Sequence, residues 1–155
     1  MDNIVSEQQT YFISGHVDIS QEDFNKYYRD KIMEAVSNPN SMFVVGNAPG
    51  ADIMAQYLLI DLLKDDNGLD RICVYHCGST PSIIADTRLK TIGGFKTHEE
   101  KDRSMTLASN IDIAYVRSHE DSKKLYGKKF RPNRISGTQK NLDRRASINN
   151  INLVK

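Results

Sequence analysis

Short apolar runs alternate with longer stretches of helical periodicity along this chain, and that alternation constrains the fold more than any other feature of the sequence. The pattern is typical of βαβ units, in which helices connect the strands of a parallel sheet. The run Met42–Val45 is apolar throughout, which indicates a strand covered on both faces. The sequence therefore predicts an α/β fold: a single domain with a mostly parallel sheet of four to five strands and helices on both faces.

Four apolar runs are predicted to be strands, at residues 10–14, 41–45, 71–76 and 111–116. Helical spacing predicts helices between them, from an N-cap at Ser20 to Val36, from about 53 to 63, from 98 to 109 and from about 137 to 147. Three segments lack a regular pattern of useful length. Residues 79–97 are expected to be irregular, with at most a short helix at 82–90. Residues 117–134 are expected to form a loop, and residues 151–154 a last short strand.

Composition excludes several classes of protein. With 155 residues, the chain can bury roughly two-thirds of its unfolded surface around one core. Its 39% hydrophobic and 26% charged residues exclude collagen-like, disulfide-framework and wholly disordered chains. No apolar run approaches the roughly 20 residues that cross a bilayer, and the N-terminus lacks the features of a secretory signal. We therefore expect a cytoplasmic protein with no membrane partner.

Charge is divided unevenly along the chain. Residues 1–70 contain 4 Lys and Arg against 12 Asp and Glu, a net charge of −8, whereas residues 71–155 contain 17 against 8, a net charge of +9. An anionic partner is therefore expected to meet the C-terminal half. The alternative is that the two halves neutralise each other in the fold.

Both cysteines lie in one predicted strand. Cys73 and Cys77 would share one face about 13 Å apart, too far for a disulfide, and His76 would point to the other face. We expect small buried side chains there, with no metal site.

Ligands of an open parallel sheet bind beyond the carboxyl ends of its strands. The loops at those ends are Ser14–His16, Gly46–Asp52, Cys77–Ser79, the segment from Arg117 onward and Ser136–Thr138. Two of them lead directly into predicted helices, whose free amides and dipole attract anions. The loop Gly46–Asp52 matches neither the Walker pattern nor the six-residue dinucleotide-binding pattern, so it is alternatively a tight turn with a purely structural role. The loop Ser136–Thr138 is alternatively an ordinary N-cap.

Three charged or titratable residues near these loops have two interpretations each. Asp52 is either a first-turn helix charge or an acceptor for a ribose hydroxyl. Arg103 belongs either to a solvated face or to a phosphate site, and His16 is either a general base or an ordinary loop residue. The candidate ligand-binding residues are therefore Ser14, Gly15, His16, Gly46, Asn47, Gly50, Ala51, Asp52, Arg103, Ser136, Gly137 and Thr138.

The order of these motifs resembles the SLOG superfamily, and most closely its YspA-like branch. The motifs are Ser-Gly-His at 14–16, Gly-Asn-Ala-Pro-Gly-Ala-Asp at 46–52, Arg-Ser-Met at 103–105 followed by Ala-Ser-Asn-Ile-Asp at 108–112, and Ser-Gly-Thr at 136–138. The resemblance covers roughly residues 10–147. It implies that 1–155 is one Rossmann-like domain that binds nucleotides or nucleotide-derived ligands, with matching positions at Gly15, Gly46, Gly50, Asp52, Gly137 and Thr138.

Two departures from the family pattern affect what can be transferred. Pro49 stands where the YspA-like branch usually has arginine, so Arg103 or the basic segment 123–134 would have to contact a phosphate instead. In the Lonely Guy phosphoribohydrolases the last motif is followed by a catalytic glutamate, whereas Gln139 follows Thr138 here. The catalysis of those enzymes is therefore not carried over.

Three functions are compatible with these features. The preferred one is a binding module that senses or sequesters a nucleotide-derived small molecule and needs no further cofactor. The first alternative is an enzyme of the hydrolase or deoxyribosyltransferase-like kind that cleaves an N-glycosidic bond, which needs a carboxylate such as Asp52 or Glu99, with Asp86 and Glu100 also near loops. The second is a nucleic-acid binder that uses the basic residues of 123–134 with Tyr126 and Phe130. A homo-oligomer is compatible with all three.

Overall fold

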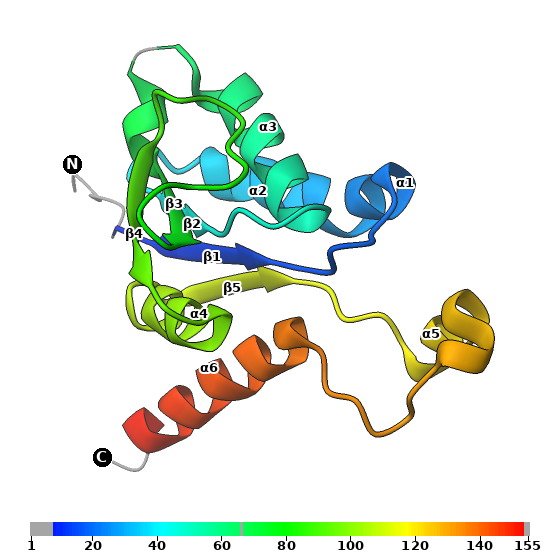
Figure 1. The fold of residues 1–155 in the computed structure, drawn as a ribbon. Coiled ribbons are helices and arrows are strands. Elements are labelled where there is room, and N and C mark those ends of the chain that lie inside the picture. The colour runs from blue at the N-terminus through cyan, green and yellow to red at the C-terminus, as the bar shows by residue number, and fades with distance from the viewer. Residues whose placement is uncertain (1–7, 66, 154–155) are drawn as a thin grey trace, which may run out of the picture.

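The computed structural model describes residues 8–65 and 67–153 and contains one five-stranded parallel sheet (Figure 1). The strands lie in the spatial order β4-β3-β2-β1-β5, and every neighbouring pair is parallel. Their bounds are Thr10–Ser14 (β1), Met42–Val45 (β2), Ile72–Cys77 (β3), Lys90–Phe95 (β4) and Ile111–Ala114 (β5). The α/β fold predicted from the alternating pattern is confirmed, including the helices on both faces of the sheet.

The first face of the sheet carries the larger core. It is covered by α1 (Gln21–Phe24), the π-helical η1 (Asn25–Arg29), α2 (Asp30–Val36) and α3 (Ala51–Leu63). Ser20 caps α1 by accepting the Asp23 amide at 3.1 Å, as its position predicted. Alternate strand residues such as Ile13, Val45 and Val74 point to this face and pack against Phe24, Tyr28, Ile32 and Leu59 of the helices.

The opposite face is covered by α4 (His98–Leu107) and α6 (Gly137–Leu153) (Figure 1). Phe12, Val44 and Tyr75 pack there against Met105 of α4. Asp112 also points to this side and pairs with Arg145 of α6 at 3.2 Å, whereas Ile113 belongs to the first core. None of the described helices is both long and apolar enough to cross a membrane.

The prediction that residues 79–97 are irregular is wrong for residues 90–95, because these form β4. This strand pairs with β3, and no helix forms at 82–90. Its residues are largely exposed because β4 is an edge strand, so the sequence carries little apolar signal. Gly93 makes the pairing possible: a β-carbon there would lie 2.0 Å from Cε1 of the buried His76 ring.

Two further predictions for the C-terminal third are wrong. The expected loop at 117–134 contains α5 (His119–Tyr126) and the 3-10 helix η3 (Gly127–Lys129). Residues 151–153 continue α6 instead of forming a strand, and Val154 lies outside the described residues. Helix α5 has no buried residue and stands away from the sheet (Figure 1). Its two apolar residues, Leu125 and Tyr126, are adjacent at its end, so the segment is too short to repeat an apolar pattern.

The strand order creates a switch point between β1 and β5. The chain builds β2, β3 and β4 outward on one side of β1 and then crosses to place β5 on the other side. In open parallel sheets, ligands bind in the crevice that such a reversal leaves at the carboxyl ends of the strands. The loops after β1 and β5, together with α5, lie at that end (Figure 1).

Candidate functional site

Two adjoining hollows open at the switch point. The large hollow, about 700 Å³, lies between the loop after β5, α5, η3 and the turn that leads into α6. The small hollow, about 250 Å³, lies between the ends of β1 and β2, α4 and the start of α6. Both are lined by His16, Tyr126, Arg134 and Ser136, so a single ligand can reach from one into the other.

Tyr28 ties together the two strand ends that border the site. Its hydroxyl donates to the Ser14 carbonyl at 2.7 Å and accepts the Tyr115 amide at 2.9 Å. Burial raises the pKa of Tyr28 to about 12, so this hydroxyl stays protonated at neutral pH. One buried side chain therefore links the ends of β1 and β5 at the switch point, in addition to the backbone pairing of the two strands.

A second link joins the loop after β1 to the loop after β5. The Arg117 amide donates to Nε2 of His16 at 2.9 Å, which requires a neutral imidazole with its proton on Nδ1. Burial and the nearby Arg117 guanidinium lower the pKa of His16 below 6.5, so the neutral form is favoured. His16 thus has a structural partner on the nitrogen that a general base would use.

Asp18 anchors α5 to this link. It accepts hydrogen bonds from the Arg117 guanidinium at 3.0 Å and from the Tyr126 hydroxyl of α5. Burial raises the pKa of Asp18, but the hydrogen bonds from Tyr126 and Arg117 outweigh burial and lower it overall. The carboxylate is therefore charged at neutral pH and compensates Arg117.

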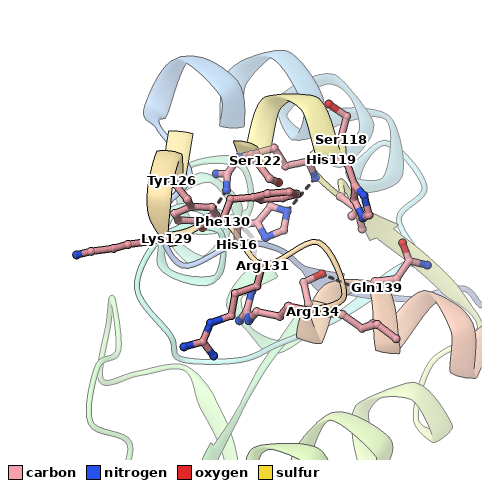
Figure 2. Close-up of a pocket in the computed structure, with 14 residues that line it drawn as sticks. His16, Ser118, His119, Ser122, Tyr126, Lys129, Phe130, Arg131, Arg134 and Gln139 are labelled. Carbon is pink, nitrogen blue, oxygen red and sulfur yellow. Dashed lines mark hydrogen bonds between the residues drawn. The ribbon is translucent and has the colours of Figure 1, made fainter. Parts of the chain in front are cut away.

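The wall of the large hollow is cationic. Arg117, Lys129, Arg131 and Arg134 line it, and among its described lining residues none is an Asp or Glu. Arg117 is paired with Asp18, whereas Arg131 and Arg134 form no ion pair with any described carboxylate. In Figure 2 these two arginines lie on one side of His16, and Tyr126 and Phe130 lie on the other. Unpaired guanidinium groups facing a cavity favour an anionic ligand.

The small hollow contains a buried charge cluster at its floor. Asp52 is buried, and its Oδ2 accepts the Ala48 amide at 3.1 Å. Burial raises the pKa of Asp52 to about 7, although the Ala48 hydrogen bond and the Lys101 ammonium counteract part of this rise. Lys101 is only 4% exposed and lies 3.8 Å from Asp102. Burial also raises the pKa of Asp102.

The N-terminus of α6 supplies further donors to the small hollow. Gly137 and Thr138 line it, and the first amides of a helix have no intrahelical carbonyl to bond. Ser136 caps the helix by accepting the Gln139 amide at 3.1 Å. Ser14 also lines the hollow, and its buried Oγ has no hydrogen-bond partner in the described part of the chain.

Most of the residues proposed from sequence gather at the small hollow. Eight of the twelve line it: Ser14, Gly15, His16, Gly46, Asp52, Ser136, Gly137 and Thr138. Asn47 instead donates to Ser82 at 3.1 Å, and the Ala51 amide donates to the His16 carbonyl at 3.1 Å. The Ala51 amide at the start of α3 is thus bonded within the protein and is not a free donor for a ligand.

Gly50 has a different role from the one expected. Its φ is +78°, and a β-carbon there would lie 2.4 Å from the His16 carbonyl oxygen and 2.5 Å from that of Val17. The glycine lets the loop after β2 pack against the loop after β1, and it does not line either hollow. A larger side chain at position 50 would therefore disturb the scaffold itself and not only a binding site.

Arg103 and Glu99 lie outside both hollows. They form an exposed i,i+4 pair at 3.5 Å on α4, and the Glu99 side chain is 67% exposed. Among the other carboxylates, Asp86 pairs with Arg88 at 2.7 Å, and Glu100 accepts the Lys96 amide at 3.2 Å. Asp52 is therefore the one carboxylate considered from sequence that borders a described hollow.

Sequence reasoning missed Lys101, Asp102 and Asn141 at the small hollow and treated the charges around Arg103 as a solvated face. A signal was present: Lys101 precedes the buried Met105 by four residues, so both lie on the same face of a helix. Arg117 and Arg134 were also missed as individual site residues, because the segment between them was read as a loop.

Cys73 and Cys77 are free and half-buried, and the Cys77 thiol lies 3.8 Å from Nδ1 of His98. No cluster of metal-ligating side chains occurs among residues 8–65 and 67–153. The two thiols are unpaired, as their predicted spacing requires, but they are half-buried where the sequence predicted small buried side chains.

Comparisons of this chain with protein-family models, with curated proteins and with solved structures find no match. The functional interpretation therefore depends on the chemistry of the two hollows.

Proposed function

We propose that the protein binds a nucleotide-derived small molecule at the switch point, with the phosphate groups of the ligand in the large hollow. The observation that carries this proposal is the unpaired cationic wall formed by Arg131 and Arg134 next to the start of α6. Membership of the SLOG superfamily and a cytoplasmic location belong to the same proposal.

The geometry suits a phosphate for two physical reasons. A guanidinium group offers paired N–H donors that match phosphate oxygens, and the dipole of the neighbouring helix N-terminus favours negative charge. Ser136, the cap of α6, lines both hollows and brings the helix end within reach of the arginine wall. Phe130 and Tyr126 add aromatic surface on which a base can stack.

One observation supports an enzyme as the second candidate. Asp52 is buried at the floor of the small hollow with a pKa of about 7, a value suited to a general acid or base at neutral pH. An enzyme that cleaves an N-glycosidic bond needs such a carboxylate near the sugar. A binding module needs only the contacts.

The binding proposal is tested with AMP, ADP, ATP and adenosine by isothermal titration calorimetry. We expect the phosphorylated compounds to bind more tightly than adenosine. The double variant Arg131→Gln/Arg134→Gln should weaken ATP binding by at least about 10-fold, because a hydrogen bond to a charged group contributes about 1.5–3 kcal/mol. Arg103→Gln removes one positive charge outside the hollows, as each single change does at the wall, and it serves as the control with affinity unchanged.

Two results would contradict this function. If Arg103→Gln weakened binding as much as the double variant, the effect would reflect overall charge instead of a site. If wild type released free base from nucleosides or nucleotides, and Asp52→Asn lost that release, the protein would be the glycosidic enzyme. Binding of oligonucleotides in place of nucleotides, lost when Lys123, Lys124, Lys128 and Lys129 become Gln, would favour a nucleic-acid binder.

A further inference from the structure

Lys101 is a buried ammonium that lacks enough partners inside the protein. An ammonium carries three donors. Lys101 has a single ion pair, 3.8 Å to Asp102, and its ammonium makes no hydrogen bond to any described residue. Lys101 lines the small hollow, and its ammonium is not among the fully enclosed atoms of the described residues. Its free donors therefore open into that hollow, where an oxygen-bearing ligand can accept them.

Asp52 stands beside Lys101 without bonding to it. The point where a β-carbon at Gly46 would lie is 2.5 Å from Asp52 Oδ2 and 3.3 Å from Lys101 Nζ, yet no ion pair joins the two side chains. The absence of a side chain at Gly46 leaves this space open. A hydrogen-bond donor and an acceptor are therefore presented next to each other at the floor of the hollow.

The charges around Lys101 in the small hollow are unsuited to a phosphate. Lys101 is flanked by the carboxyl groups of Asp52 and Asp102, whereas the described lining of the large hollow contains no acidic residue. Asp18 also lines the small hollow, but its oxygens are occupied by Arg117 and Tyr126. Hydroxyl groups fit such a mixed site, because each can donate to a carboxylate and accept from an ammonium.

We propose that the small hollow is a ribose subsite in which Lys101 donates to one ring hydroxyl and Asp52 accepts from its neighbour. The volume of about 250 Å³ accommodates a pentose, and Ser136 connects this space to the arginine wall that would hold the phosphates. Ser14 Oγ, buried without a partner among the described residues, is a third contact. The inference rests on the proposed function and specifies its ligand class: ribonucleotide-derived, in preference to 2′-deoxyribonucleotide-derived.

The preference follows from what a deoxy ligand leaves unsatisfied. A 2-deoxyribose lacks one of the two neighbouring hydroxyls, so either Lys101 or Asp52, both largely buried residues, would lose its hydrogen bond to the ligand. Sites built to bond a hydroxyl discriminate strongly against analogues that lack it. We expect wild type to bind the ribo compound about 10- to 100-fold more tightly, the ratio that the loss of one hydrogen bond to a charged group produces.

The experiment uses two matched pairs of probes, ATP with dATP and ribose 5-phosphate with 2-deoxyribose 5-phosphate. Affinities are measured by calorimetry or by NMR titration of the protein. Lys101→Met keeps most of the aliphatic stem and removes the ammonium, so it should reduce the preference to about 3-fold or less. Lys96→Met, an exposed lysine that lines neither hollow, is the control and should keep the full preference.

Wild type alone provides a readout if Lys101→Met does not fold. Ribose 5-phosphate should shift the amide signals of Gly46, Lys101 and Thr138, and 2-deoxyribose 5-phosphate should shift them less at equal concentration. Equal affinities for both members of each pair, or a preference that survives in Lys101→Met, would overturn the ribose subsite.

The two proposals fail in distinguishable ways. If ATP and dATP bind equally well and both depend on Arg131 and Arg134, the proposed function stands and the ribose subsite is wrong. If ribose 5-phosphate is preferred but no nucleotide binds, the subsite stands and the ligand is a sugar phosphate. If no probe binds at millimolar concentration, both proposals are wrong.

Discussion

At the scale of single residues, the glycines show how the same residue type serves different purposes. Gly50 allows a close approach of one loop to another, whereas Gly46 leaves room beside Asp52 and Lys101 at the floor of the small hollow. Gly137 begins α6 with open space around it. A glycine in a loop sequence therefore indicates that space is needed, but only the surrounding fold shows what occupies that space.

Gly93 provides a test of this reasoning. Because an added β-carbon would clash with the buried His76 ring, we expect Gly93→Ala to lower the free energy of unfolding by about 1–3 kcal/mol, the usual cost of overpacking. Gly137→Ala is the matched control and should change it by less than about 0.5 kcal/mol, because no atom lies within 4 Å of the new carbon. Urea denaturation measures both, and equal effects would contradict the role assigned to Gly93.

At the scale of elements, α6 is held to the sheet mainly by polar contacts at its centre. Arg145 pairs with Asp112 of β5 at 3.2 Å and donates to the Ser109 carbonyl at 2.8 Å. Both side chains of the pair are largely buried. Since α6 also supplies the helix end at the site, this pair positions the donors of Gly137 and Thr138.

Removing one partner of the Asp112–Arg145 pair should lower the free energy of unfolding more than removing both partners. Asp112→Ala leaves the Arg145 guanidinium buried without its carboxylate, and we expect a loss of about 3–5 kcal/mol in the free energy of unfolding. The double variant Asp112→Ala/Arg145→Met should lose less than Asp112→Ala alone, and therefore clearly less than the sum of the two single changes, as measured by a double-mutant cycle in urea. Strict additivity would show that the two side chains do not interact.

Helix α5 differs from α6 because it has no buried residue. Its ends are well defined by local signals: Ser118 accepts the Asp121 amide at 3.0 Å, acidic residues occupy the first turn, and Lys123 and Lys124 occupy the last. Its connection to the rest of the molecule at the site runs through Tyr126 and Asp18. Three lining residues of the large hollow, His119, Ser122 and Tyr126, thus belong to an element that local capping and a few polar contacts hold in place.

At the scale of the whole molecule, the charge division along the sequence becomes a division across the sheet. Residues 1–70 build β1, β2 and the helices of the first face, whereas the later residues build the opposite face and α5. Among the described ion pairs, Asp18–Arg117 alone joins the two halves. Direct pairing therefore does not neutralise the basic half, which supplies the arginine wall.

Burial of Asp52 should make global stability depend on pH. Its pKa is about 7 in the folded protein against an ordinary 3.8, so the folded state holds a proton that the unfolded chain releases. This contribution is fully present below about pH 4 and is lost as the pH rises through 7. His16 acts in the opposite direction: its lowered pKa contributes stability above pH 6.5 that is lost as the pH falls.

Comparison with Asp52→Asn isolates the Asp52 contribution. The amide keeps an acceptor for Ala48 and carries no charge, so the variant should exceed wild type in melting temperature above pH 7 and lose that advantage toward pH 4. We expect a gain of at least about 2–4 °C at pH 8, the change that 1 kcal/mol produces in a domain of this size. Asp61→Asn removes an exposed charge from the same helix and is the control. A gain that does not vary with pH would contradict the burial argument.

The alternation of apolar runs and helical spacing was sufficient to predict the parallel sheet, four of its strands and the helices on both faces. It succeeds because β1, β2, β3 and β5, together with their helices, bury side chains at regular intervals, and that burial is what the periodicity records. The same reasoning placed Ser14, Asp52 and Thr138 at strand and helix ends that border one hollow.

Only the tertiary structure decided the remaining features. β4 is largely exposed and α5 is a short helix without a buried residue, so neither element follows from a long apolar pattern. Their positions depend on pairing with β3 and on the Asp18–Tyr126 contact. Lys101 and Asp52 are far apart in the chain, as are Arg134 and His16, yet all four line the small hollow. They come together in a fold whose crossover places β5 beside β1. Local sequence determines which segments are buried, but it does not determine which strand ends become neighbours, and the site is formed by those neighbours.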